Sequence, residues 1–146
     1  MIDSINLGPA TVLAQGIVTF PTTRVRSNRC NYARGGWLTH DEGSGQFDLF
    51  GGCRECGSVF EITFNANVAA PTTPGLSALV LQTNGESVGG TEMDSTSAAV
   101  NEYNNIAMTT FVRVPKGATK TITIKNLSLT ESVLVKDANI TIKKIA

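Results

Sequence analysis

One stretch of strictly alternating side chains limits what this chain can fold into more than any other part of its sequence. In residues 60–68, aromatic and aliphatic side chains occupy every second position, and polar side chains occupy the positions between them. The apolar positions are Phe60, Ile62, Phe64, Ala66 and Val68, and the polar ones are Glu61, Thr63, Asn65 and Asn67. A period of two over this length predicts a β-strand with one face on an apolar core and the other on water or a polar neighbour.

Other segments with strand and turn character surround this stretch. We expect strands at residues 13–20, 46–50, 76–83, 86–92, 104–114, 118–127 and 139–145, a re-entry into the sheet at residues 37–39, and loops at residues 93–103 and 128–137. The Asn84-Gly85 pair predicts a tight hairpin, because both residues accept the positive φ angles of such a turn. Eight or nine short strands at this spacing are typical of an all-β antiparallel sandwich.

Composition and charge narrow the classes of function. Only 16% of the 146 residues are charged and 14 are glycine, which suits one compact β domain. The formal net charge is zero, so the whole chain has no electrostatic basis for binding nucleic acid or an anionic membrane. No stretch approaches the roughly 20 apolar residues that span a bilayer, and the first residues lack the pattern of a signal peptide. We therefore expect a protein that is made in a cytoplasm and is not secreted by the usual route.

The first 36 residues differ in charge from the remainder and are expected to form an extended docking arm. Residues 4–40 contain no acidic residue and four arginines, namely Arg24, Arg26, Arg29 and Arg34. We expect these arginines to pair with acidic side chains on a partner protein. A solvated loop is the second interpretation, and a nucleic-acid surface with Tyr32 and Trp37 nearby for stacking is the third. Residues 37–146 then form the sandwich domain.

The expected strand at residues 76–83 is apolar on both faces, and such a strand is usually covered on both. Leu76, Ala78 and Val80 share one face, and Leu79 and Leu81 share the other. One face can pack on the sandwich core, and an identical subunit would cover the other. We therefore place a subunit interface at Leu76, Leu79 and Leu81.

The Cys53-Arg54-Glu55-Cys56 motif has the spacing of half a zinc site or of a redox pair. A zinc site needs four ligands, and the sequence adds only Cys30 and His40. A redox pair normally lies at a helix N-terminus, where the dipole lowers the thiol pKa, whereas this motif joins two expected strands. We favour a tight turn without chemistry. A disulfide that involves Cys30 or another subunit, and a metal site at Cys30, Cys53 and Cys56, are the alternatives.

Catalysis has little support in the sequence. His40 is the sole histidine and lies in the segment HDEGSG, which predicts a solvated turn. Hydrolysis needs a base, an orienting acid and a nucleophile brought together, and no such set can be assembled from neighbouring residues. The carboxylates lack the spacing of a calcium loop, and the glycines do not form a phosphate-binding loop. We therefore expect no enzymatic activity, no metal and no cofactor.

Several segments taken in order resemble a known family. The segments are GSGQFDLFGG, FEITFNANV, ALVLQTNGESVGGTE, NNIAMTTFVRVPKGATKTITIKNLS and ANITIKKIA. Their order and spacing over residues 37–146 resemble the jelly roll of tumour necrosis factor and of complement globular heads. The closest resemblance is to small versions in spore-surface collagen-like proteins and in tailed-phage virion proteins. The resemblance implies a homotrimer around a three-fold axis. It does not extend to residues 4–36, and the Gly-X-Y stalk of the spore-surface proteins is missing.

These expectations lead to two functional hypotheses. The first is a non-enzymatic phage virion protein, a trimeric capsid decoration or head or tail knob that docks on the major capsid protein or another virion protein through residues 1–36. It would be made in the host cytoplasm and located in the virion, without contact to membrane or nucleic acid. The alternative is a receptor- or carbohydrate-binding knob of a phage fibre or bacterial surface protein, with a site near Trp37, Tyr103 and Asn104.

Overall fold

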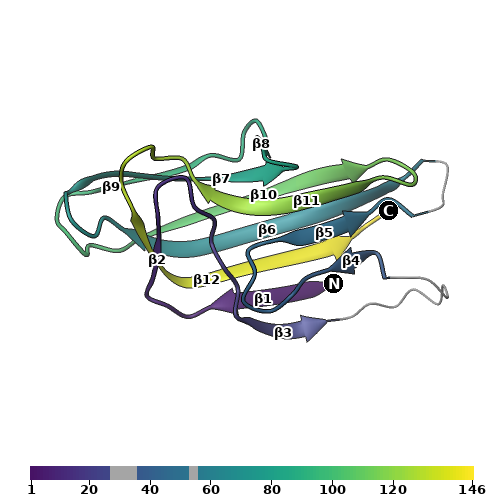
Figure 1. Ribbon diagram of the computed structural model, residues 1–146, viewed down its shortest axis with the longest axis horizontal. Helices are drawn as coiled ribbons and strands as arrows, with labels where there is room; N and C mark the ends of the chain where they lie inside the picture. Colours follow the sequence, from purple (N-terminus) through teal and green to yellow (C-terminus); the bar gives the residue numbers. More distant parts are fainter. Residues whose placement is uncertain (27–35, 53–55) are drawn as a thin grey trace.

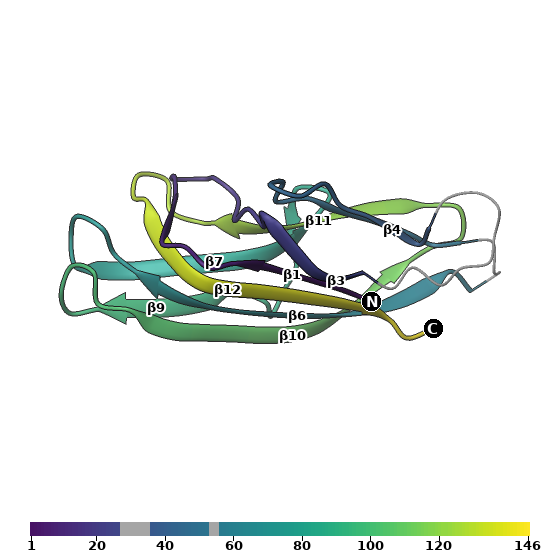
Figure 2. The same ribbon diagram turned by 90° about the horizontal axis from the view of Figure 1, so that it is seen from below.

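The computed structural model describes residues 1–26, 36–52 and 56–146, which form two antiparallel sheets packed face to face (Figures 1 and 2). The first sheet has the order β10 (Asn104–Val114), β6 (Ser58–Ala69), β12 (Val133–Lys144), β1 (Ile2–Asn6) and β3 (Thr22–Arg26), and β2 (Ala10–Val12) also pairs with β12. The second has the order β4 (Leu38–Thr39), β5 (Phe47–Phe50), β11 (Thr119–Asn126), β7 (Gly75–Thr83) and β8 (Glu86–Ser87), and β9 (Met93–Ser97) also pairs with β7. Within these ranges no helix is long and apolar enough to cross a membrane.

Strand β6 is the centre of the first sheet, as its alternating sequence predicts. It pairs with β10 on one side and with β12 on the other. Phe60, Ile62 and Phe64 are completely buried between the sheets, while the polar residues between them are half-buried on the outer face. Burial of each of these three side chains stabilises the fold by about 1.5–3 kcal/mol. The predicted antiparallel jelly-roll sandwich is therefore confirmed.

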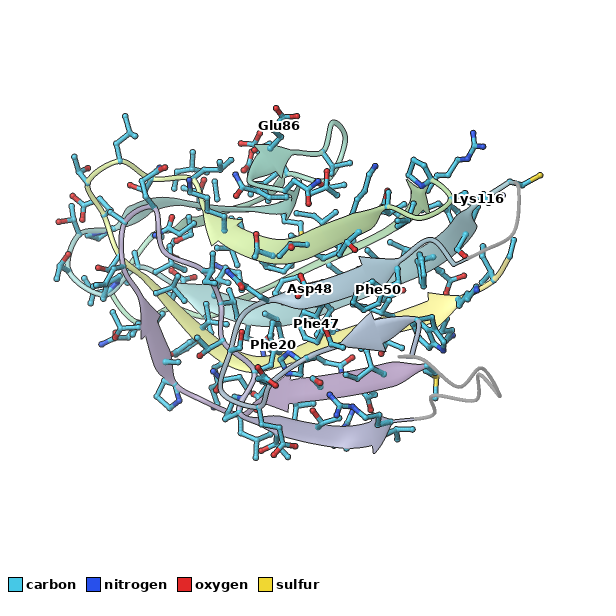
Figure 3. All side chains as sticks on the ribbon, turned by 45° about the vertical axis from the view of Figure 1, so that its right-hand side comes forward. Phe20, Phe47, Asp48, Phe50, Glu86 and Lys116 are labelled. Carbon is cyan, nitrogen blue, oxygen red and sulfur yellow. The ribbon has the colours of Figure 1, made fainter. Side chains whose placement is uncertain are left out.

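The described part of the N-terminal segment is built into the sandwich, which corrects the expected arm. Strand β1 pairs with β12 and with β3, so the first strand lies beside the last. Phe20 is completely buried and makes an edge-to-face contact with Phe47 at 5.4 Å between ring centroids (Figure 3). A second edge-to-face contact joins Phe20 to Phe64, with 6.4 Å between ring centroids. Residues 2–26 thus contribute strands and core to the same sandwich as residues 37–146.

Strand β1 was missed because two of its inward positions are polar. Ile2, Ser4 and Asn6 point inward and are buried. The Ser4 hydroxyl is hydrogen-bonded to the Thr23 hydroxyl at 3.1 Å, and Asn6 Nδ2 donates to the Thr19 carbonyl at 3.0 Å. These bonds satisfy the buried groups, but in the sequence they hide the apolar alternation that marks a strand.

Other local expectations also differ from the structure, among them the strand expected at residues 86–92, of which only Glu86–Ser87 forms a strand. Residues 13–20 form only one isolated bridge, between Ile17 and Lys125, instead of a strand. Strand β9 occupies part of the expected loop at residues 93–103, and β12 begins at Val133 within the expected loop at residues 128–137. The predicted hairpin at Asn84-Gly85 is confirmed, with φ angles of 52° and 81° at the turn between β7 and β8.

Candidate functional site

The outer face of the first sheet carries polar side chains in register across its strands, and we call it the polar face. Its members are Asn105, Ala107, Thr109, Phe111 and Arg113 of β10, Glu61, Thr63, Asn65 and Asn67 of β6, Lys136, Asn139, Thr141 and Lys143 of β12, and Asp3 of β1. Pairing places Thr109, Thr63 and Thr141 in one row. The neighbouring row contains Asn65 and Asn139. The polar face follows from the alternation of side chains along a strand. Because the even-numbered residues 60–68 of β6 point into the core, the odd-numbered residues 61–67 point outward.

Hydrogen bonds between side chains join the strands of the polar face. The hydroxyls of Thr63 and Thr109 are 3.0 Å apart. Asn105 Nδ2 donates to Asn67 Oδ1 at 3.2 Å, and Asn67 Nδ2 donates to Asp137 Oδ2 at 3.4 Å. Many polar groups of this surface therefore already have partners within the chain, which lowers the cost of removing them from water.

Asp3 and Glu61 of the polar face each have a cationic partner. Asp3 accepts a hydrogen bond from Asn139 Nδ2, and its other carboxylate oxygen lies 2.8 Å from an Arg24 guanidinium nitrogen. Lys143 Nζ lies 3.7 Å from Glu61 Oε1. Partly exposed pairs of this kind stabilise the fold by at most about 1 kcal/mol each. Their larger consequence is that no carboxylate of these two pairs is left without a partner, whereas Arg113 and Lys136 are exposed cations of the same face.

One end of the polar face exposes two large apolar side chains next to Arg113. Phe111 of β10 is 60% exposed and lies opposite Glu61 of β6. Ile145 directly follows β12, is 52% exposed, and donates its backbone N–H to the Val59 carbonyl at the start of β6. Two large apolar side chains thus flank β6 from opposite sides without cover.

The expected docking arginines contact their own chain where the structure describes them. Arg24 pairs with Asp3, as above, and a guanidinium nitrogen of Arg26 donates to the His40 carbonyl. They hold edge strand β3 to its neighbours, so in the single chain they are not positioned as free cations. Arg29 and Arg34 lie outside the described residues.

The expected subunit interface at residues 76–81 needs correction. Leu79 and Leu81 are completely buried in the core of the single chain, so they have no surface left for another copy. On the opposite face of β7, Ala78 and Val80 are also buried within the chain. Only Leu76 is exposed. An apolar strand face therefore did not require a second subunit, because neighbouring groups of the same chain cover it.

His40 is buried, which is contrary to the predicted solvated turn. Its ring is 5% exposed and stacks on Phe47 at 4.0 Å between centroids, with 10° between the planes. Nδ1 lies 2.8 Å from the Gln46 carbonyl, and Nε2 has no hydrogen-bond partner among the described residues. The acidic neighbours Asp41 and Glu42 are exposed, as a turn predicts. Nothing in the local sequence indicated that Phe47 would cover the ring.

The remaining expected site residues do not form a cluster in the described structure. Cys56 is free and exposed, while Cys30 and Cys53 lie outside the described residues. Nowhere in the described ranges do three or more His, Cys, Asp or Glu side chains gather in a metal-binding arrangement. Trp37, expected beside a ligand, is instead buried against Phe60 at 5.5 Å between ring centroids. Tyr103 remains partly exposed, with Lys136 Nζ 5.8 Å from its ring centroid.

Solved structures of other proteins share the two-sheet architecture of this chain. The globular domain of zebrafish complement 1qA superposes with a TM-score of 0.64 and 12% identity over 99% of this chain and 96% of that chain. Murine APRIL superposes with a TM-score of 0.55 and 11% identity over 97% of this chain and 98% of that chain. At this identity the similarity shows a shared jelly-roll fold and nothing further. No protein-family model and no curated protein matches the sequence.

Proposed function

We propose that this chain is a non-enzymatic structural protein that assembles as a homotrimer through the polar face of its first sheet. We further propose that it serves in a phage virion, as a capsid decoration or a head or tail knob. The observation that supports the trimer best is the polar face, a surface with internal hydrogen bonds, two paired carboxylates and two uncovered apolar side chains at one end. The virion role is supported by the sequence resemblance alone.

The properties of the polar face suit burial against identical copies. An unpartnered polar group costs about 1–3 kcal/mol when it is buried, whereas much of this surface is already hydrogen-bonded. Identical copies also repeat every charge, so a strongly charged face would repel itself, and here Asp3 and Glu61 each have a cationic partner. Phe111 and Ile145 supply apolar area that is exposed in the single chain. The family that the sequence resembles forms trimers, which supports the same assembly.

The oligomeric state tests the first half of the proposal. The chain has a mass of 15.4 kDa, so light scattering after gel filtration should give about 46 kDa, three times that mass. Phe111→Lys should release monomers, because three ammonium groups would then enter an apolar contact. Thr123→Lys, on the outer face of the second sheet, is the matched control and should remain trimeric. A wild-type monomer, or a trimer that is unaffected by Phe111→Lys, would contradict the polar face as interface.

The virion role needs a separate measurement. Purified phage particles that carry the gene should contain the protein in stoichiometric amounts by mass spectrometry, and the purified trimer should rebind particles from which it has been removed. Absence from the particles would refute the virion role and leave the trimer untouched. The alternative, a receptor- or carbohydrate-binding knob, predicts that the isolated protein binds host cells and competes with infection. Whether Arg29 and Arg34 contribute to docking stays a prediction for their alanine variants in the rebinding assay.

A further inference from the structure

We propose that the loop end of the sandwich, opposite the two chain termini, binds a lysine or arginine side chain presented by a partner protein. The receiving group is the Glu131 carboxylate, at the rim of a small pocket between residues 70–77 and residues 131–132. Figure 1 shows both termini at the other end of the molecule. The proposal is independent of the trimer, which uses a sheet face instead of this end.

The pocket has the size of a site for one side chain. Its volume is about 120 Å³, whereas pockets for small-molecule substrates usually measure about 300–1,000 Å³. Pro71, Pro74 and Leu76 contribute its apolar wall, and Glu131 is its only charged lining residue. An apolar wall with a single carboxylate matches an aliphatic stem that ends in a cation, as in lysine and arginine.

The backbone that carries Glu131 is held firmly in place. The side chain of Asn126 is completely buried, and its Nδ2 donates to the Glu131 carbonyl at 2.9 Å. Its Oδ1 accepts the backbone N–H of Ser128 at 3.0 Å, and the Ser128 hydroxyl accepts the backbone N–H of Glu131 at 2.8 Å. The loop is therefore preorganised by its own hydrogen bonds, which lowers the entropic cost of binding.

The Glu131 carboxylate takes no part in building this loop. It has no ion pair or side-chain hydrogen bond among the described residues. The other acidic residue at this end, Glu102, is used internally, because its Oε2 accepts the backbone N–H groups of Ala98 and Ala99 at 2.9 and 3.0 Å. Of the two acidic residues in the described loops at this end, Glu131 is thus the one whose carboxylate remains available to a partner.

Exposed apolar side chains on the Glu131 loop and on the loop bonded to it extend the contact surface. Leu13 is 68% exposed and Leu129 is 82% exposed. Their loops are joined by the hydrogen bond from the Gln15 N–H to the Ser128 carbonyl at 3.1 Å. Residues 13–17, 70–77, 98–102 and 127–132, which make up this end, contain no lysine or arginine. An apolar surface with one available negative charge disfavours anionic lipid or nucleic acid and favours a protein surface with a protruding basic side chain.

The binding test uses the full chain and a minimal probe. Nα-acetyl-lysine methylamide is titrated into ¹⁵N-labelled protein, with Nα-acetyl-norleucine methylamide as a probe that keeps the stem and lacks the ammonium group. Lysine should shift the amide resonances of residues 70–77 and 130–132, with half-saturation at roughly 1–10 mM for a ligand of this size. Norleucine should bind at least about fivefold more weakly, because a hydrogen bond to a charged group is lost.

Variants separate the proposed site from general attraction of cations. Glu131→Gln keeps the shape of the side chain and should weaken lysine binding at least about fivefold. Glu86→Gln is the matched control and should leave binding unchanged. This exposed acidic residue (labelled in Figure 3) lies on β8, which pairs with Gln82 and Thr83 at the opposite end of β7 from the pocket residues Gly75–Ser77. Leu76→Ser should weaken lysine and norleucine alike, which tests the apolar wall without removing charge. Equal binding of the two probes, no saturation, or unchanged binding by Glu131→Gln would each overturn the proposal.

Discussion

Replacement of Phe20 by alanine tests whether the N-terminal segment is part of the core. Phe20 is completely buried between Phe47 and Phe64. Removing a buried phenylalanine costs about 3–5 kcal/mol, and an edge-to-face pair contributes about 0.5–1.5 kcal/mol beyond its burial. We therefore expect Phe20→Ala to lower the free energy of unfolding by about 4 kcal/mol. This is a large part of the 5–15 kcal/mol that is typical of a domain.

Urea unfolding measures this change directly. The single tryptophan, Trp37, is buried against Phe60 and reports unfolding by fluorescence. With a denaturant slope of about 2 kcal/mol/M, a loss of 4 kcal/mol moves the midpoint down by about 2 M. All proteins are compared at one chain concentration, because assembly would stabilise the folded state by mass action. If the alanine variant does not fold, Phe20→Leu gives a smaller loss of the same sign.

Leu13→Ala is the control within the same segment. Leu13 is mostly exposed, so its replacement should change the free energy of unfolding by no more than about 0.5 kcal/mol. If residues 1–26 formed a detached arm, Phe20→Ala and Leu13→Ala would both change the free energy of unfolding by no more than about 0.5 kcal/mol. A loss below about 1 kcal/mol for Phe20→Ala would therefore refute the reasoning.

Two further predictions concern single polar and glycine positions. Asn126→Ala removes a completely buried amide that bonds three backbone carbonyls, and should cost about 2–4 kcal/mol in urea unfolding; a loss under 1 kcal/mol would contradict the role of Asn126 in fixing its loop. Gly51→Ala would place a Cβ atom 1.8 Å from the Pro115 carbonyl oxygen, and should cost about 1–3 kcal/mol or more. Gly89→Ala meets nothing within 4 Å and should stay within about 0.5 kcal/mol by the same measurement; equal losses for the two glycines would contradict the close approach at Gly51.

The sequence predicted those parts of the fold in which local pattern and tertiary burial agree. The alternation in β6 is uninterrupted, so its faces could be assigned from the sequence alone, and the Asn84-Gly85 turn depends only on local backbone preference. Strand β1 was missed because Ser4 and Asn6 point inward and find partners in distant residues. Such pairing depends on tertiary neighbours and leaves no periodic signal.

The candidate sites were predicted less well, for a related reason. Leu79 and Leu81 were assigned to an interface because the strand is apolar on both faces, but a sequence does not show how much of a face its own neighbours cover. His40 was assigned to a solvated turn from its polar neighbours, although an aromatic ring seven positions later covers it. The polar face was visible as alternate positions of β6, but its hydrogen-bonded rows depend on strands up to 138 residues away in the chain, such as Asp3 beside Thr141.

The pairing of β1 with β12 has a consequence for biosynthesis. A nascent chain that has left the ribosome up to the end of β11 still lacks the strand that lies between β6 and β1. Until those last residues emerge, the first strand has only the short β3 beside it and the aromatic core is open to solvent. The first sheet therefore cannot be completed until β12 has been synthesised, and a chain truncated before Val133 lacks the strand that joins β6 to β1.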